Sequence, residues 1–290
     1  LLPYDSLPES LDADNPPETP VVHQASRILA IDAEIKQPYL ERISRFYDAK
    51  AESTTSADAK ANLDAWAKLH TAGLIPKSAI DPTPDTVAVL QDALLFGAAW
   101  RQPFTDEAPM DFDTPRGIET VDGVSEAMLV PWVEGDRWQA VRLAYDDNLA
   151  ADVILPADGV APESLTVDEL EAARTALDDE APSSVLVTMP TLDLTAKNDL
   201  LETLPQLDLS NLSGIVPGAE ASQWVQQAKL IVSARGTVGA ALTEMGLTFS
   251  GGGPIAEVEF IVDRPYVFRV LDTSTGWPLF LATISDPTRE

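Results

Sequence analysis

Side chains that commonly carry catalysis or bind metals are scarce in this chain. Its 290 residues include two histidines and no cysteine, so it has no thiolate nucleophile, no thiolate metal site and no disulfide framework. His23 and His70 lie far apart in the sequence, and neither has potential ligands at the spacing of a metal site. We therefore expect both histidines to have structural roles and the protein to hold no metal.

Carboxylates are numerous, but their pattern carries no catalytic signature. Adjacent pairs such as Asp146–Asp147 are expected by chance among 47 acidic residues, and we interpret them as a solvated surface. The glycines of SGGG, residues 250–253, are followed by neither a lysine nor the pattern of a helix N-terminus, unlike a phosphate-binding loop. The motifs G-x-S-x-G, H-E-x-x-H, G-x-x-x-x-G-K-[ST] and C-x-x-C are missing. The sequence predicts a protein that is not an enzyme and uses no cofactor.

The segment with the most informative spacing is GTVGAALTEMG, residues 236–246. It separates two strand-like runs, LIVSA and VEFIV, yet it is too long for a hairpin turn. Its small and larger residues alternate as those of a strand do. One face carries nothing larger than threonine: Thr237, Gly239, Ala241 and Thr243. The pattern indicates a loop that is able to become a strand.

The elements around this segment indicate large sheets. Helical spacing of apolar residues predicts helices over 36–47, 58–75 (ending near Gly73), 166–179 and 198–204. Apolar runs predict strands over 26–31, 86–100, 125–133, 138–145, 149–156, 185–194, 226–234, 256–263, 266–272 and 278–284, with 86–100 central in its sheet. Residues 1–20 are expected to form a loop or a frayed end. Because helices come mainly early and strands mainly late, the predicted fold class is α+β.

Composition and charge exclude several kinds of partner. An apolar fraction of 45% is enough for one large core or two modest ones. The net charge of −28 repels phosphate backbones and anionic lipid surfaces, so we expect neither nucleic acid nor membrane partners. No apolar run approaches the ~20 residues that span a bilayer.

Three segments resemble parts of the serpin family. FIVDRPYVFRVLDTSTGWPLFLATISDP, residues 260–287, is similar to the closing segment of serpins, although Tyr266 stands where phenylalanine is usual. DALLFGAAWRQPF, residues 92–104, resembles the third strand of the main sheet, with Trp100 near the place where a loop would first enter that sheet. LDAWAKLHTAGLI, residues 63–75, is similar to the helix that crosses the face of the sheet. The resemblance extends over roughly residues 20–290.

The resemblance implies one serpin-like domain over residues 1–290, with large mixed sheets, helices packed on one side, and a hinge and exposed reactive loop over 236–259. In inhibitory serpins a protease cuts the loop, which then inserts into the main sheet as a new strand and carries the acyl-enzyme with it. Small inward residues would obstruct this insertion little. The residues that match the hinge are Gly236, Thr237, Gly239, Ala240, Ala241 and Thr243.

The spacing of the family also implies where the loop would be cut. Counting from Gly236 places the reactive bond between Ser250 and Gly251, and counting back from the Asp-Arg-Pro turn agrees within about two residues. Phe249 suits a chymotrypsin-like protease, whereas Ser250 suits an elastase- or subtilisin-like one. The resemblance therefore predicts a serine protease inhibitor that acts as a monomer. The commoner role of such inhibitors is outside the cell, so an extracellular location is favoured, although the acidic surface is equally compatible with the cytoplasm.

Two features favour an alternative function. Serpins usually have glutamate at the positions of Ala234 and Val238, and we expect both residues to lie outward or at the edge of the sheet. The helices and the strand that open a serpin are not visible before residue 20, and Leu1 is not a natural start, so we expect an N-terminally incomplete sequence. The alternative is a serpin-fold binding or structural protein that inhibits nothing, or an inactive remnant.

Overall fold

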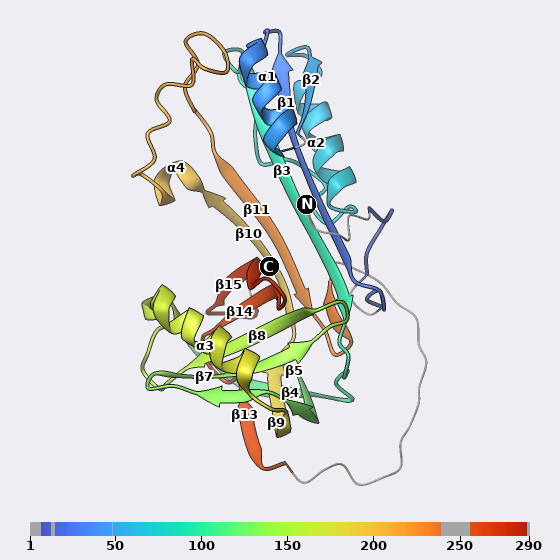
Figure 1. Cartoon of the computed structure of the whole chain (residues 1–290), viewed down its shortest axis with the longest axis vertical. Coiled ribbons are helices and arrows are strands. Elements are labelled where there is room, and N and C mark those ends of the chain that lie inside the picture. Colours follow the sequence, from blue (N-terminus) through green and yellow to red (C-terminus); the bar gives the residue numbers. More distant parts are fainter. Residues whose placement is uncertain (1–6, 13–14, 48, 239–255, 289–290) are drawn as a thin grey trace. The chain divides into compact units, whose positions relative to one another are not determined.

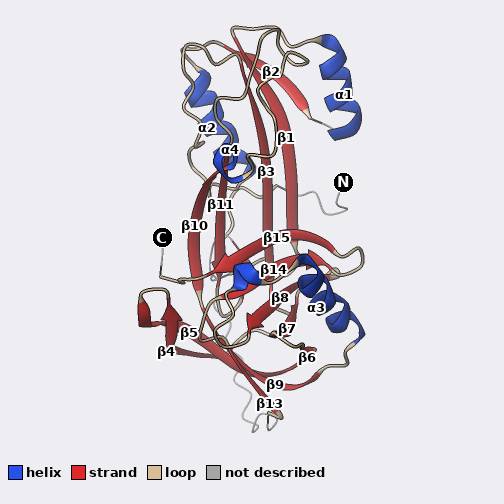
Figure 2. Cartoon of the chain, turned by 90° about the vertical axis from the view of Figure 1, so that its left-hand side faces the viewer, coloured by secondary structure: helices blue, strands red, loops and turns tan. Residues whose placement is uncertain are grey.

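The computed structural model describes residues 7–12, 15–47, 49–238 and 256–288. Within these ranges the chain forms three β-sheets and four α-helices, which confirms the α+β fold class (Figure 1 and Figure 2). Residues 7–12 and 15–20 contain neither a helix nor a strand. None of the described helices is long and apolar enough to cross a membrane.

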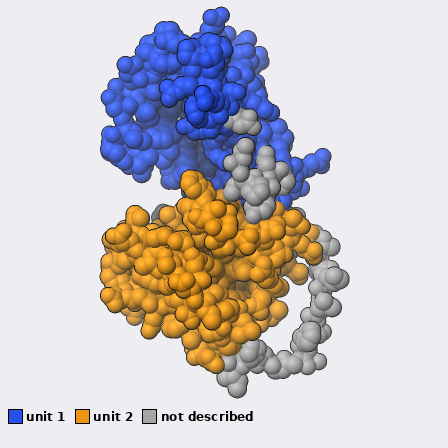
Figure 3. Space-filling view, viewed as in Figure 1, with its two compact units in different colours: residues 1–11, 21–95, 195–229 blue, residues 12–20, 96–194, 230–290 orange. Residues whose placement is uncertain are grey.

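The chain divides into two compact units, which are coloured separately in Figure 3. Unit 1 comprises residues 1–11, 21–95 and 195–229, and unit 2 comprises residues 12–20, 96–194 and 230–290. Three strands contribute residues to both units: β3 (Ala88–Ala99), β10 (Leu192–Asp199) and β11 (Val225–Val232). The predicted single domain over residues 1–290 stays a prediction.

The largest sheet has six strands in the order β10-β11-β12-β3-β1-β2. The predicted central strand over 86–100 is confirmed as β3, which occupies an interior position. The three-residue strand β12 (Gly236–Val238) lies between β11 and β3. The run GTVGAALTEMG therefore begins as a strand inside this sheet.

In unit 1, β1 (Val21–Ile31) pairs in parallel with β2 (Lys50–Thr54). Helix α2 (Ala59–His70) packs its apolar face on β1, and Leu63 of this helix belongs to a core with Leu29, Ile31, Ala59 and Val89. The helix ends as predicted near Gly73, where a positive φ of 84° favours glycine. The other helices of the unit are α1 (Gln37–Tyr47) and α4 (Leu200–Thr203).

Unit 2 contains two further sheets. The first has the order β13-β9-β5-β4 and is built from β4 (Asp106–Thr114), β5 (Gly117–Val130), β9 (Ser183–Pro190) and β13 (Val258–Ile261). The second has the order β15-β14-β8-β7-β6 and is built from β6 (Trp132–Glu134), β7 (Trp138–Ala144), β8 (Leu149–Pro156), β14 (Tyr266–Asp272) and β15 (Trp277–Ile284). Strands β12 and β13, which come before and after residues 239–255, belong to different sheets.

Helix α3 (Val167–Asp179) packs on the second of these sheets, after a short 3₁₀ turn at Pro162–Ser164. Its capping box begins at Thr166, whose side chain accepts a hydrogen bond from the Glu169 amide. Beneath the helix, the fully buried carboxylate of Asp152 binds Arg142 and Arg269 from the neighbouring strands, at 2.6 Å each. This carboxylate joins β7, β8 and β14 because Arg142 donates to both of its oxygens and Arg269 donates to Oδ2.

Candidate functional site

The first residues of the hinge-like run are paired on both sides. Gly236 lies opposite Ala99 and Thr237 opposite Ala98 of β3, in an antiparallel ladder. On the other side, Val232 lies opposite Thr237 and Ile231 opposite Val238, again antiparallel. Strand β12 therefore forms the start of an interior strand, although it is much shorter than the twelve residues of β3.

The close approach of β12 to β3 requires glycine at position 236. A Cβ atom on Gly236 would lie 2.3 Å from the carbonyl oxygen of Ala98 and 2.9 Å from the Cα of Ala99. It would also lie 2.7 Å from Cγ of Pro16. Two of these neighbours are backbone atoms, which cannot move aside as a flexible side chain can, so any larger residue would displace the strand.

Thr237 points into the interior and is held there by a hydrogen bond. Only 2% of its surface is exposed, and its Oγ1 accepts a hydrogen bond of 2.6 Å from the hydroxyl of Tyr145. Tyr145 directly follows β7 and is itself only 1% exposed. Burial raises the pKa of Tyr145 well above its usual range, so the hydroxyl keeps its proton and remains a donor.

Aromatic rings fix the position of the Tyr145 hydroxyl. Its ring stacks on Trp100, with centroids 4.5 Å apart and an angle of 11° between the planes. Phe96 meets the same ring edge-on at 5.2 Å. Both partners come from β3 or its end, so the strand that pairs with Thr237 also supports the tyrosine that binds it.

The turn before β12 is tied to the end of β3. The Nε1 of Trp100 donates to the carbonyl of Ser233 at 3.0 Å, and its backbone amide donates to the carbonyl of Arg235 at 2.8 Å. The backbone amide of Phe104 donates to the carbonyl of Ala234 at 2.8 Å. Trp100 therefore lies beside the residues that lead into β12, and its predicted role at the entry of the sheet stays a prediction.

The structure describes only part of the predicted site. Gly236 and Thr237 lie in β12, and Thr237 faces inward as expected. The prediction for Ala234 was wrong: it is 8% exposed, because the hydrogen bonds to Trp100 and Phe104 draw its turn inward. The other predicted residues lie outside the described ranges, so their roles stay predictions: Gly239, Ala240, Ala241, Thr243, Phe249, Ser250 and Gly251.

Sequence reasoning missed the part of the site contributed by Tyr145. This residue ends a run correctly predicted as a strand, but it lies 92 positions before Thr237. Only the pairing of strands from different parts of the chain brings the two hydroxyls together. No local spacing signals such a contact.

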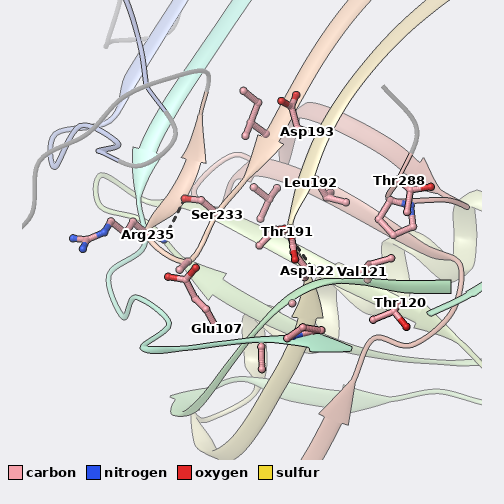
Figure 4. Close-up of a pocket in the computed structure, with 17 residues that line it drawn as sticks. Glu107, Thr120, Val121, Asp122, Thr191, Leu192, Asp193, Ser233, Arg235 and Thr288 are labelled. Atoms are coloured by element: carbon pink, nitrogen blue, oxygen red, sulfur yellow. Dashed lines mark hydrogen bonds between the residues drawn. The ribbon is translucent and has the colours of Figure 1, made fainter. Parts of the chain in front are cut away.

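A polar pocket of about 670 Å³ lies next to this turn, within unit 2 (Figure 4). Its wall includes Ser233, Ala234 and Arg235, and the amide of Arg235 donates to the Ser233 hydroxyl at 3.2 Å. The carboxylates of Glu107, Asp122 and Asp193 also border it. Within the described ranges no three His, Asp or Glu side chains are placed to hold a metal ion.

The two histidines form an unexpected pair in unit 1. The Nε2 atom of His23 and the Nδ1 atom of His70 are 2.9 Å apart, which is a hydrogen-bond distance, and the rings stack with centroids 5.2 Å apart. His23 belongs to β1 and His70 to the last turn of α2, so the pair joins the helix to the strand. This position agrees with a structural role.

With this geometry in place, comparison with known proteins defines the family. The family model described as Serpin (serine protease inhibitor) matches residues 4–287. The chain belongs to the serpin family. The resemblance to the serpin family is thereby confirmed.

The curated relatives are distant and longer than this chain. A serpin-like protein of Thermococcus kodakarensis is 25% identical over 87% of the chain and 63% of its own length. Alpha-2-antiplasmin of Bos taurus is 28% identical over 87% of the chain and 54% of its own length. Alpha-1-antitrypsin 1-4 of Mus musculus is 25% identical over 89% of the chain and 66% of its own length.

Solved structures show the same fold. Human kallistatin matches with a TM-score of 0.77 and 22% identity, covering 93% of this chain and 76% of its own. Human thyroxine-binding globulin in complex with thyroxine matches with a TM-score of 0.76 and 20% identity, covering 96% of this chain and 78% of its own. At these identities the likeness concerns the fold alone. Serpins are generally inhibitors rather than catalysts.

Proposed function

We propose that this protein inhibits a serine protease by the loop-insertion mechanism. In this proposal the protease cuts the segment between β12 and β13, at a bond near Phe249, Ser250 or Gly251. The released segment then continues β12 through the six-stranded sheet, and Gly239, Ala240, Ala241 and Thr243 follow Gly236 and Thr237 as inserted residues. The covalently attached protease is carried along before it can hydrolyse the acyl bond.

The observation that supports this proposal is the pairing of β12 on both sides. Continuing its register two residues past Thr237 would place Gly239 opposite Phe96 of β3 and Leu230 of β11. Side chains directly opposite in a sheet are only about 5 Å apart, so a residue without a side chain fits between these two large neighbours. The small residues of the inward face thus match the space that the flanking strands leave.

Energetics explain why the later residues of the segment matter. Each hydrogen bond that insertion forms contributes about 1 kcal/mol net, whereas ordering each residue costs about 1–2 kcal/mol. Pairing alone therefore gives little driving force. We infer that the rest comes from relief of a metastable uncut state and from burial of Met245, Leu247 and Phe249.

The test is to incubate the full chain with chymotrypsin, elastase and subtilisin and to analyse the products by denaturing gel electrophoresis and mass spectrometry. We expect an SDS-stable adduct with at least one protease, and cleavage between residues 249 and 251. A clipped band without an adduct for all three would contradict inhibition. It would favour the alternative, a serpin-fold binding or structural protein, to which the absence of glutamate at Ala234 and Val238 also points.

A variant tests the insertion step separately. Thr237→Arg places a charge at a position that is 2% exposed, and burying an unpaired guanidinium is unfavourable. We expect the adduct to be replaced by clipped product, while the rate of cleavage stays similar. Thr237→Ser, which keeps the hydroxyl, is the control and should still form the adduct. An unchanged yield of adduct with Thr237→Arg would rule out insertion through β12.

A further inference from the structure

We propose that Tyr145 is a positioning residue that anchors the start of the loop segment in the sheet before any cleavage, through its hydrogen bond to Thr237. Its effect on inhibition rests on the proposed function, but the anchor itself does not. The anchor consists of the Tyr145 hydroxyl, Thr237 Oγ1 and the Trp100 ring that supports the tyrosine.

The anchor is rigid on the side of the tyrosine. Its ring is held between Trp100 and Phe96, and its backbone amide donates to the carbonyl of Leu149 at 2.9 Å. The preceding carbonyl, of Ala144, accepts from the amide of Arg101 at 2.8 Å. A donor fixed in this way loses little freedom when it binds, so most of the hydrogen-bond energy is available to hold Thr237.

The anchor also selects one register. Strand β12 is paired at only two residues with each neighbour, and such short pairing is weak by itself. A slip by one residue would bring Gly236 or Val238 to the tyrosine, and neither has a hydroxyl to accept the hydrogen bond. The hydrogen bond between Tyr145 and Thr237 can therefore form in only one register of β12.

This selection has a consequence for the competition that decides inhibition. After cleavage, an anchored segment extends a strand that is already in register, whereas a released one must first find the register. Loss of the anchor should slow insertion relative to hydrolysis of the acyl-enzyme. More inhibitor molecules would then be consumed as substrate for each adduct formed.

The first measurement is hydrogen exchange in the uncut protein, followed by mass spectrometry of peptides that cover residues 233–238. We expect Tyr145→Phe and Thr237→Val each to speed exchange about fivefold, which corresponds to a hydrogen bond of about 1 kcal/mol. The double variant should exchange no faster than either single variant, because both remove the same contact. Thr237→Ser should keep slow exchange, since it retains the acceptor.

A matched control is available in the same unit. Tyr266 is also completely buried, and its hydroxyl has no hydrogen-bond partner among the described residues. Tyr266→Phe makes the same chemical change away from β12, and we expect exchange over residues 233–238 to stay unchanged. Unchanged exchange in Tyr145→Phe, or additive effects in the double variant, would overturn the anchor.

The second measurement is the stoichiometry of inhibition with whichever protease forms the adduct. We expect Tyr145→Phe and Thr237→Val to raise the ratio of clipped inhibitor to adduct about fivefold, and Thr237→Ser to restore the wild-type ratio. If exchange speeds up while the ratio stays constant, the positioning role is wrong. If the wild type forms no adduct, the proposed function fails, and the exchange measurement still decides whether the anchor exists.

Discussion

Gly236 and Gly214 show that the importance of a glycine depends on its surroundings. Gly236 is enclosed by the backbone of β3, whereas a Cβ on Gly214 would meet no atom within 4 Å. We expect Gly236→Ala to lower the free energy of unfolding by roughly 1–3 kcal/mol through overpacking, and to release β12. Gly214→Ala should change it by less than about 0.5 kcal/mol. Denaturant unfolding of the two variants measures this difference, and equal effects would contradict the packing seen at β12.

Tyr266 carries a buried hydroxyl without a hydrogen-bond partner among the described residues. The residue stands where serpins usually have phenylalanine, its ring packs edge-on against Phe112, and its hydroxyl is buried without a described partner. Burial also raises its pKa, so the hydroxyl stays protonated. We expect Tyr266→Phe to raise the free energy of unfolding by about 1 kcal/mol, because an unsatisfied polar group leaves the core. If thermal unfolding experiments show a lower free energy of unfolding for Tyr266→Phe than for the wild type, the hydroxyl has a hydrogen-bond partner.

Single residues of the site were predictable where local pattern determines them. The alternation of small and larger residues predicted that Thr237 faces inward, and the resemblance to serpins predicted that Trp100 lies near the hinge. Tyr145 and the burial of Ala234 were not predictable, because each depends on contacts between strands distant in sequence. The unusual residue at 266 was visible in the sequence, but only the structure shows that its hydroxyl is unsatisfied.

At the scale of elements, helix α2 is held on β1 by buried polar contacts as well as by its apolar face. The guanidinium of Arg27, on β1, donates to Gln91 at 2.7 Å and to Asn62 of α2 at 2.8 Å. It also binds Glu52 and lies over the ring of Trp66. The histidine pair adds a contact at the last turn of the same helix. The interface between α2 and β1 therefore includes two histidines, a residue type whose charge depends on pH.

His70 makes the docking of α2 sensitive to acid. Burial lowers the pKa of His70 below its usual range, and His23, Lys50 and Arg27 lower it further, against a smaller opposite effect of Glu52. Below about pH 6.5 the unfolded chain takes up a proton more readily than the folded one. The stability that His70 contributes is therefore complete above this pH and is lost as the pH falls toward its folded pKa.

We expect the melting temperature of the wild type to fall more steeply between pH 8 and 5 than that of His70→Gln, which has no proton to gain at this position. The measurement is circular dichroism melting of both proteins at each pH. The difference between the two curves isolates His70 from the many carboxylates that titrate in both. Parallel curves would show that the histidine pair does not sense pH.

Elements with strong apolar patterns were predictable, and weak strands were not. The predicted helices over 36–47, 58–75 and 166–179 correspond to α1, α2 and α3. The apolar runs of β8 and β14 are strands buried along their whole length, and that of β3 is a partly buried strand. Strands β2 and β4 were missed. The sequence of β4, DEAPMDFDT, is acidic and contains proline, so only its position at the edge of the sheet beside β5 makes it a strand.

At the scale of the whole molecule, cutting the loop should change stability. If the segment that follows Val238 joins the six-stranded sheet after cleavage, its insertion adds hydrogen bonds and buries side chains. We expect limited cleavage to raise the melting temperature, by about 2–4 °C for each kcal/mol gained. Calorimetry before and after clipping measures this change. Cleaved Thr237→Arg is the control, and its melting temperature should stay close to that of the uncut variant because its segment does not insert. An unchanged melting temperature in the clipped wild type would contradict insertion.

The pairing of β12 also determines strand directions in the sheet that receives it. Because β12 is antiparallel to both β11 and β3, those two strands run parallel to each other. A longer strand between them would extend both antiparallel ladders, whose straight hydrogen bonds are slightly more stable per residue than the slanted bonds of a parallel pair. Lengthening β12 would thus extend an arrangement in which β11, β12 and β3 alternate in direction.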